Sequence, residues 1–177
     1  RLYKHFDLFG FGKKTGIMLA NEQSGTLPSP EWKKEVFDED WTLGNTYHTS
    51  IGQFGWQVTP LQMAVAYAAL ANGGKFFEPQ VVKDAPPVFE EQPLLEYELN
   101  VVREGMRMTT NYPRGTARPL ERSDVAIAAK SGTAEIGAGN AYVNSWAAGY
   151  FPYEEPKYAF VLLMDKAPRS NALGATR

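Results

Sequence analysis

The sequence predicts an α+β fold in which helices come first and an antiparallel sheet follows. Two observations lead to this prediction: a strongly capped helix near the middle of the chain, and three apolar runs with short connections in its last third. The apolar period changes between these two parts from helical to strand-like. Because the predicted strands are adjacent in sequence and not separated by helices, we expect them to pair antiparallel.

The clearest helix signal covers residues 59–72. Thr59 can cap the helix, Pro60 suits the first helical position, and Gln62 can complete a capping box. Apolar residues then follow at helical spacing until Asn72-Gly73-Gly74 ends the pattern. A second helix is predicted over 94–110.

The segments around these helices give weaker patterns. We expect a helix and a turn at the start of the chain, then a short strand at 17–20. From 21 to 44 we expect a long surface loop with one helical turn. Residues 75–82 are predicted to be extended, and 84–93, which contains three prolines, is predicted to be a linker.

Three strands are predicted in the last third, at 125–129, 144–151 and 158–164, with 152–157 as the turn of a hairpin. Both ends of the chain look cut, because helical spacing is already under way at Leu2 and the last residues contain no clear closing element. We therefore expect a piece of a longer domain.

The composition supports one packed core and excludes several classes of function. The 177 residues are 44% hydrophobic, with 18 basic and 20 acidic side chains and a formal net charge of −2. Without a basic patch or a run of like charges, we expect no nucleic-acid partner. The absence of cysteine and the presence of only two histidines predict no metal site, and we expect no cofactor.

One short motif, Lys130-Ser131-Gly132-Thr133-Ala134, directly follows a predicted strand. An apolar strand that leads into Lys-Ser/Thr-Gly-Thr is a signature of serine acyl-transfer enzymes that attack penicillin-like amides. Lys130 would stabilise an anion and ease proton transfer, and the hydroxyls of Ser131 and Thr133 could bind a substrate carboxylate. Gly132 would let a ligand backbone pair with the strand, and the Thr133 N–H would face the oxyanion. The alternative is an ordinary turn after a strand.

Further segments surround this motif in a fixed order. They are 9–16 (FGFGKKTG), 27–32 (LPSPEW), 50–53 (SIGQ), 58–64 (VTPLQMA), 69–74 (ALANGG), 105–106 (GM), 115–117 (GTA) and 147–152 (AAGYFP). In this order they resemble class B penicillin-binding proteins, most closely the elongation-type members that are similar to penicillin-binding protein 2. The resemblance covers nearly the whole chain, which makes it more specific than the five-residue motif.

The resemblance implies a D,D-transpeptidase that cross-links peptidoglycan stem peptides through a serine acyl-enzyme and is acylated by β-lactams. It also implies an antiparallel sheet with helices on both faces, to which this chain contributes three of five strands. The implied location is periplasmic, on the outer face of the cytoplasmic membrane. The implied partners are a membrane glycosyltransferase and other proteins of the elongation complex.

The same resemblance assigns roles to individual residues. The catalytic candidates are Lys130 and Thr133, the latter through its backbone amide. The substrate-binding candidates are Ser131, Gly132, Thr133, Ala134, Glu135, Gln53 and Trp56. Glu135 could instead be a surface residue, and Trp56 is explained equally well as a packing anchor.

The family's nucleophile is missing from this sequence. No serine has a lysine three residues later or an asparagine two residues later, so the Ser-x-x-Lys and Ser-x-Asn motifs are absent. In the family both motifs precede the Phe-Gly-Phe-Gly stretch. We therefore interpret residues 1–177 as the C-terminal portion of a single transpeptidase domain, inactive alone. The alternatives are a β-lactamase or β-lactam sensor domain of the same fold, and a non-catalytic peptidoglycan-binding or scaffold module.

Three other features favour structural explanations. His48 has no paired serine or aspartate pattern nearby, so we interpret it as a solvated loop histidine. The consecutive acids at 38–40 are more typical of an exposed face than of a metal site. Trp146 is predicted to lie in the core.

Overall fold

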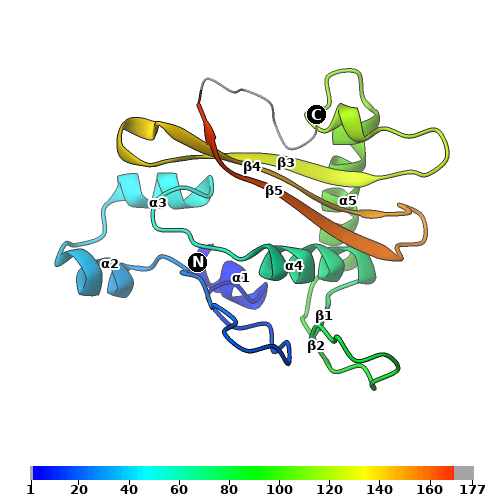
Figure 1. Ribbon diagram of the computed structural model, residues 1–177, viewed down its shortest axis with the longest axis horizontal. Coiled ribbons are helices and arrows are strands. Elements are labelled where there is room, and N and C mark those ends of the chain that lie inside the picture. The colour runs from blue at the N-terminus through cyan, green and yellow to red at the C-terminus, as the bar shows by residue number, and fades with distance from the viewer. Residues whose placement is uncertain (1, 170–177) are drawn as a thin grey trace.

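The computed structural model describes residues 2–169, which form five α-helices, two short 3₁₀ helices and two antiparallel sheets. Figure 1 shows the larger sheet above α4, with α2 and α3 toward one end and α5 toward the other. This combination of helices with an antiparallel sheet confirms the predicted α+β class. No helix among the described residues is long and apolar enough to cross a membrane.

The larger sheet has the strand order β3-β4-β5, and both pairs are antiparallel. Its strands are β3 (Ala128–Ile136), β4 (Tyr142–Phe151) and β5 (Tyr158–Pro168). The predicted strand at 125–129 was wrong in position, because β3 begins at Ala128 and the Lys130–Ala134 motif lies inside it. Nine consecutive residues of β3 pair with β4, so the pairing extends the strand through residues with weak strand preference.

Helix α4 (Pro60–Asn72) begins and ends where the sequence predicts. The Thr59 side chain accepts from the Gln62 N–H, the Gln62 side chain accepts from the Thr59 N–H, and Gly73 ends the helix at a φ of 92°. The helix packs against β4 and β5. Its partly buried residues Tyr67, Leu70 and Ala71 cover one face of the sheet. There they belong to an apolar cluster whose buried members are Met106, Ala128 and Tyr150.

Helix α5 (Glu96–Asn111) confirms the predicted helix over 94–110 and packs against β3 (Figure 1). The chain then turns back through the 3₁₀ helix η1 (Arg118–Leu120), which lies close to the other face of the sheet. There a second apolar cluster is formed by Ala117, Ile127, Ala129, Leu120, Val125, Phe151 and Phe160. Residues near the start of β3 are therefore packed on both faces of the sheet.

The prediction of a surface loop over 21–44 was wrong. This part of the chain contains α2 (Pro30–Phe37) and the start of α3 (Leu43–Ser50). Both helices depend on local caps: Ser29 accepts a hydrogen bond from the Trp32 N–H, and Thr42 forms a capping box with Asn45. Neither helix has the sustained apolar period on which a sequence-based prediction relies.

The remaining connections also differ from expectation. After α1 (Leu2–Leu8), residues 17–20 are irregular and not a strand. Only Lys75–Phe77 of the predicted extended segment is a strand, β1, and it pairs with β2 (Phe89–Glu91) inside the predicted linker. This pairing joins two three-residue segments that are distant in sequence, so local patterns do not reveal it.

Gln62 connects α4 to two loops that precede it in the sequence. The side chain is 2% exposed, and its Nε2 donates to the carbonyls of Lys13 (2.6 Å) and Ser24 (2.7 Å). Its Oε1 accepts from the Thr59 N–H at 2.9 Å. One buried amide therefore satisfies three backbone groups and fixes the glycine-rich segment and residues 24–26 against the helix.

We expect Gln62→Leu to lower the free energy of unfolding by about 2–4 kcal/mol, because it leaves buried backbone groups without partners. Gln80→Leu is the matched control, since Gln80 is exposed and makes one hydrogen bond, to the Pro86 carbonyl. This control should change stability by less than about 0.5 kcal/mol. The measurement is chemical unfolding followed by tryptophan fluorescence, and equal effects of the two substitutions would contradict the proposed anchor.

Candidate active site

A cavity of about 310 Å³ lies between β3 and the segments that pack beside α4. One wall is the strand with the Lys-Ser-Gly-Thr-Ala motif, and the facing wall is mostly apolar. The lining residues are Phe6, Phe11, Ser50, Ile51, Gly52, Trp56, Val58, Met63, Tyr67, Lys130, Ser131, Gly132, Thr133, Ala134, Trp146 and Ala148. The structure therefore brings all five motif residues and Trp56 together.

The alternation of side chains along β3 gives the motif two faces. Lys130 and Gly132 are opposite Ala148 and Trp146, on the face that α4 covers. Ser131 and Thr133 point to the other face, and they border the cavity at the edge of the strand. The Lys130 Nζ lies across this edge and donates to the Ser131 carbonyl at 2.5 Å.

β3 is an edge strand of the part of the sheet that the structure describes. In an antiparallel pair, alternate residues turn their N–H and C=O groups to the same edge. The Ala129 carbonyl points away from β4, because it accepts a hydrogen bond from Thr109 on α5. Ser131, Thr133 and Glu135 share this orientation, so the N–H and C=O of Thr133 face the open edge beside the cavity. This edge can accept an extended ligand by backbone pairing.

Trp56 is both a packing residue and part of the cavity wall. Its indole N–H donates to the Thr49 carbonyl at 3.0 Å, and its ring makes edge contacts with Phe6 (4.7 Å between centroids) and Phe11 (5.8 Å). The two interpretations of Trp56 that the sequence left open are therefore compatible. Phe6 and Phe11 were not predicted as lining residues, although they belong to the predicted opening helix and to the glycine-rich segment after it.

Two predicted substrate-binding residues do not line the cavity. Gln53 lies in the turn after α3, where its backbone N–H donates to the His48 carbonyl. Glu135 lies past the cavity on β3, and its carboxylate binds Asn140 (2.8 Å) and Arg169 (3.0 Å). These two contacts connect the β3–β4 turn to the end of β5. The alternative that Glu135 is a structural surface residue therefore explains its position better.

Trp146 was expected in the core, but it is half-buried and lines the cavity. It lies on β4 directly opposite Gly132, which has no side chain to cover it.

His48 is exposed, as expected, although it lies on α3 and not in a loop.

The wall near α4 is weakly polar and carries no ionised group at neutral pH. Burial raises the pKa of the Tyr67 hydroxyl, which therefore stays protonated. Deeper in the same cluster, burial raises the pKa of Tyr150 to about 12. Lys130 is the one lysine, arginine, histidine, aspartate or glutamate among the residues that line the cavity.

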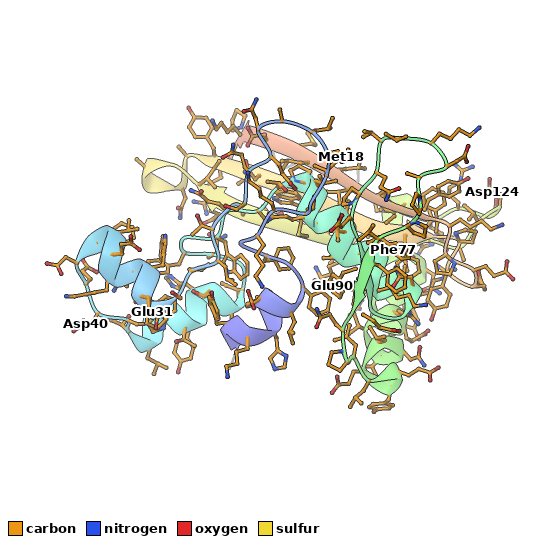
Figure 2. The ribbon with its side chains drawn as sticks, turned by 90° about the horizontal axis from the view of Figure 1, so that it is seen from below. Met18, Glu31, Asp40, Phe77, Glu90 and Asp124 are labelled. Carbon is orange, nitrogen blue, oxygen red and sulfur yellow. The ribbon has the colours of Figure 1, made fainter. Side chains whose placement is uncertain are left out.

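The described residues contain no group of three or more metal-ligating side chains. The acids at 38–40 lie at the outer end of the α2–α3 region, and Figure 2 shows Asp40 far from the sheet. Lys33 binds this segment through the Asp40 carbonyl (2.7 Å) and the Glu39 carboxylate (3.1 Å). These contacts favour the interpretation of the acids as a surface turn.

Gly132 and Gly149 differ in the space around them. A Cβ at Gly132 would meet only the Trp146 Cβ, at an ordinary contact distance of 3.6 Å. A Cβ at Gly149 would collide with the backbone of β3, 2.8 Å from the Ala129 Cα. The fold therefore requires glycine at position 149 but not at position 132, where the missing side chain leaves space in the cavity.

We expect Gly149→Ala to lower the free energy of unfolding by about 1–3 kcal/mol or more, because the methyl group overpacks a backbone contact. Gly132→Ala should change it by less than about 1 kcal/mol. Thermal unfolding of the two variants tests this difference. A large loss of stability in Gly132→Ala would show that this glycine is structural.

Comparison with known proteins agrees with this geometry. The model of the family described as the penicillin binding protein transpeptidase domain matches residues 1–177. The peptidoglycan D,D-transpeptidase MrdA of Haemophilus influenzae is 32% identical over 184 residues, which cover 90% of this chain and 28% of that protein.

Two solved structures share the fold. The complex between penicillin-binding protein PBP2 and MreC from Helicobacter pylori matches with a TM-score of 0.82 and 32% identity, over 99% of this chain and 32% of that chain. Pseudomonas aeruginosa PBP2 in complex with WCK 5153 matches with a TM-score of 0.84 and 31% identity, over 94% and 39%. The chain spans well under half the length of each relative. From the match over its whole length, this chain belongs to the penicillin-binding protein transpeptidase family.

Proposed function

We propose that this chain is the C-terminal portion of a peptidoglycan D,D-transpeptidase domain and supplies one wall of its acylation cleft. The observation that carries the proposal is the edge strand β3, whose Lys130–Ala134 motif lines a cavity and whose outer edge is open beside it. The family membership and the relatives' D,D-transpeptidase activity support the same reaction. The serine nucleophile would come from a part of the protein outside these 177 residues.

The geometry of β3 suggests how its residues would act in this reaction. The Thr133 N–H faces the open edge, where it can stabilise the oxyanion that forms when a serine attacks the substrate carbonyl. The adjacent Thr133 C=O can accept a hydrogen bond from the substrate backbone. The Lys130 ammonium would increase the positive potential of the cleft, favouring proton transfer from the nucleophile and binding of the substrate carboxylate.

The substrate would be a stem peptide that ends in D-Ala-D-Ala. The serine attacks the carbonyl of the penultimate D-Ala, the bond to the terminal D-Ala breaks, and that residue leaves with a proton on its amine. An amine of a neighbouring strand then takes the acyl group and restores the serine hydroxyl. A β-lactam would acylate the same serine and lack a departing leaving group, which explains a long-lived adduct.

We also propose that the whole protein acts on the periplasmic side of the cytoplasmic membrane as part of the elongation machinery. The relative in complex with MreC and the relative named peptidoglycan D,D-transpeptidase support this placement. A membrane glycosyltransferase would supply the glycan strands.

In the full-length protein, Lys130→Ala should lower the rate of labelling by a fluorescent penicillin by about 100-fold or more, because it removes the positive charge of the cleft. Lys157→Ala is the matched control, since Lys157 lies exposed in the β4–β5 turn. Labelling is followed by gel fluorescence over time. An unchanged rate in Lys130→Ala would contradict the proposed role, and release of the label within seconds would favour the β-lactamase alternative.

The isolated 177-residue chain should not be labelled by penicillin and should not behave as a soluble monomer. It lacks a Ser-x-x-Lys serine, and the described part of β5 exposes apolar side chains such as Tyr158 (62%), Leu162 (48%) and Met164 (39%). Exposed apolar surface and open strand edges promote association. Sedimentation as a folded monomer, or covalent labelling of the purified chain, would contradict the proposal that this is an incomplete domain.

A further inference from the structure

The C-terminal end of α5 binds β3 immediately before the motif. Thr109 Oγ1 donates to the Ala129 carbonyl at 2.5 Å, and Thr110 Oγ1 donates to the Ile127 carbonyl at 2.6 Å. Ala129 is the residue before Lys130, whereas Ile127 lies just outside the strand. The helix therefore covers the outer edge of β3 up to Ala129, and the open edge begins at the motif.

Thr109 is itself held in place by the segment that follows α5. Its carbonyl accepts a hydrogen bond from the Ala117 N–H at 3.0 Å. Gly115 packs so closely against it that a Cβ there would lie 2.6 Å from the Thr109 carbonyl carbon. Thr109 Oγ1 also lies 2.9 Å from the Met106 carbonyl oxygen. A hydroxyl group has one proton to donate, and the Ala129 carbonyl oxygen is the nearer of these two acceptors. The helix end is thus a fixed support for the strand.

Ala129 is restrained from its other edge as well. It lies opposite Gly149 on β4, where no side chain can be accommodated, and it is completely buried. Beyond Ala129 the strand has one neighbour only, β4, among the described residues. The contact between Thr109 and Ala129 is therefore the last support on the outer edge before the strand enters the cleft.

We propose that Thr109 is a positioning residue for acyl transfer: its hydrogen bond to Ala129 fixes the edge strand so that Lys130 and the Thr133 N–H stay aligned with the cleft. This inference rests on the function proposed above. Thr133 follows Ala129 by four residues, about 13 Å along an extended strand. A small movement of Ala129 would therefore also displace the Thr133 N–H, which faces the oxyanion. A displacement of about 1 Å can lower the rate of a reaction by about a hundredfold.

The test compares Thr109→Val, Thr109→Ser and Thr110→Val in the full-length protein. Thr110→Val is the matched control, because it removes a neighbouring hydroxyl that is also bonded to a backbone carbonyl near β3, from a side chain that is even more buried than Thr109. Rapid-mixing kinetics with a fluorescent penicillin separate the initial binding constant from the first-order acylation rate constant. Thr109→Val should lower that rate constant about three- to tenfold with a smaller effect on binding.

Thr109→Ser should restore most of the rate, because the hydroxyl remains. Thr110→Val should lower the melting temperature as much as Thr109→Val does and leave the acylation rate constant close to that of the unsubstituted protein. The proposal is overturned if Thr109→Val acylates at the normal rate, if serine does not rescue it, or if Thr110→Val slows acylation equally.

Hydrogen exchange provides a measurement that does not depend on acylation. In Thr109→Val, without penicillin, the amides of Lys130, Gly132, Ala134 and Ile136, which face β4, should exchange about three- to tenfold faster than in the unsubstituted protein, since the edge strand has lost a hydrogen bond. Unchanged exchange overturns the positioning role. A full-length protein that no penicillin labels would instead refute the proposed function, and the exchange result would still decide whether Thr109 supports the strand.

Discussion

The candidate site depends on a difference between the two edges of β3 in how many hydrogen bonds hold them. On one edge the strand pairs with β4 along its whole length, and the contact at Gly149 is so close that a methyl group would collide with Ala129. On the other edge, in the part of the chain that the structure describes, α5 supports only the beginning of the strand, through Thr109 and Thr110. Proteins commonly cover or charge an unpaired strand edge, because open edges invite association. Here the open part coincides with the motif, which is the arrangement that ligand binding by strand addition requires.

The apolar wall that faces β3 is assembled from segments that are distant in sequence. Phe6 and Phe11 come from the start of the chain, Trp56 from the segment before α4, and Tyr67 from α4 itself. Gln62 keeps these segments together, since its buried amide binds the carbonyls of two loops while it caps the helix. A capping residue that also satisfies distant backbone groups couples the start of a helix to the shape of the cavity. The cavity thus follows from the same contacts that stabilise the fold around α4.

The sequence predicts the elements whose signals are local and strong. Thr59, Gln62 and Gly73 define α4 without tertiary information, and the apolar runs at 144–151 and 158–164 with the turn at 152–157 define the hairpin of β4 and β5. The motif also predicts the wall of the cavity at Lys130–Ala134. The helices over 30–50 are missed because their stability comes from caps and not from an apolar period, and β1 and β2 are missed because their pairing is long-range. Trp146 is misplaced in the core because its position opposite Gly132 depends on the strand register, which the sequence does not reveal.

Some glycines of the chain are needed for the fold, whereas Gly132 is explained by the candidate site. At Gly115 and Gly149 a side chain would collide with backbone atoms of Thr109 and Ala129, so packing alone explains these two glycines. At Gly132 the nearest atom is the Trp146 Cβ, 3.6 Å away, and the backbone conformation does not demand glycine. A glycine that neither packing nor backbone geometry requires, in a strand where glycine costs conformational entropy, needs another explanation. The space that it leaves lies in the cavity beside the free edge, where a ligand backbone would approach β3, so the explanation belongs to the site and not to the fold.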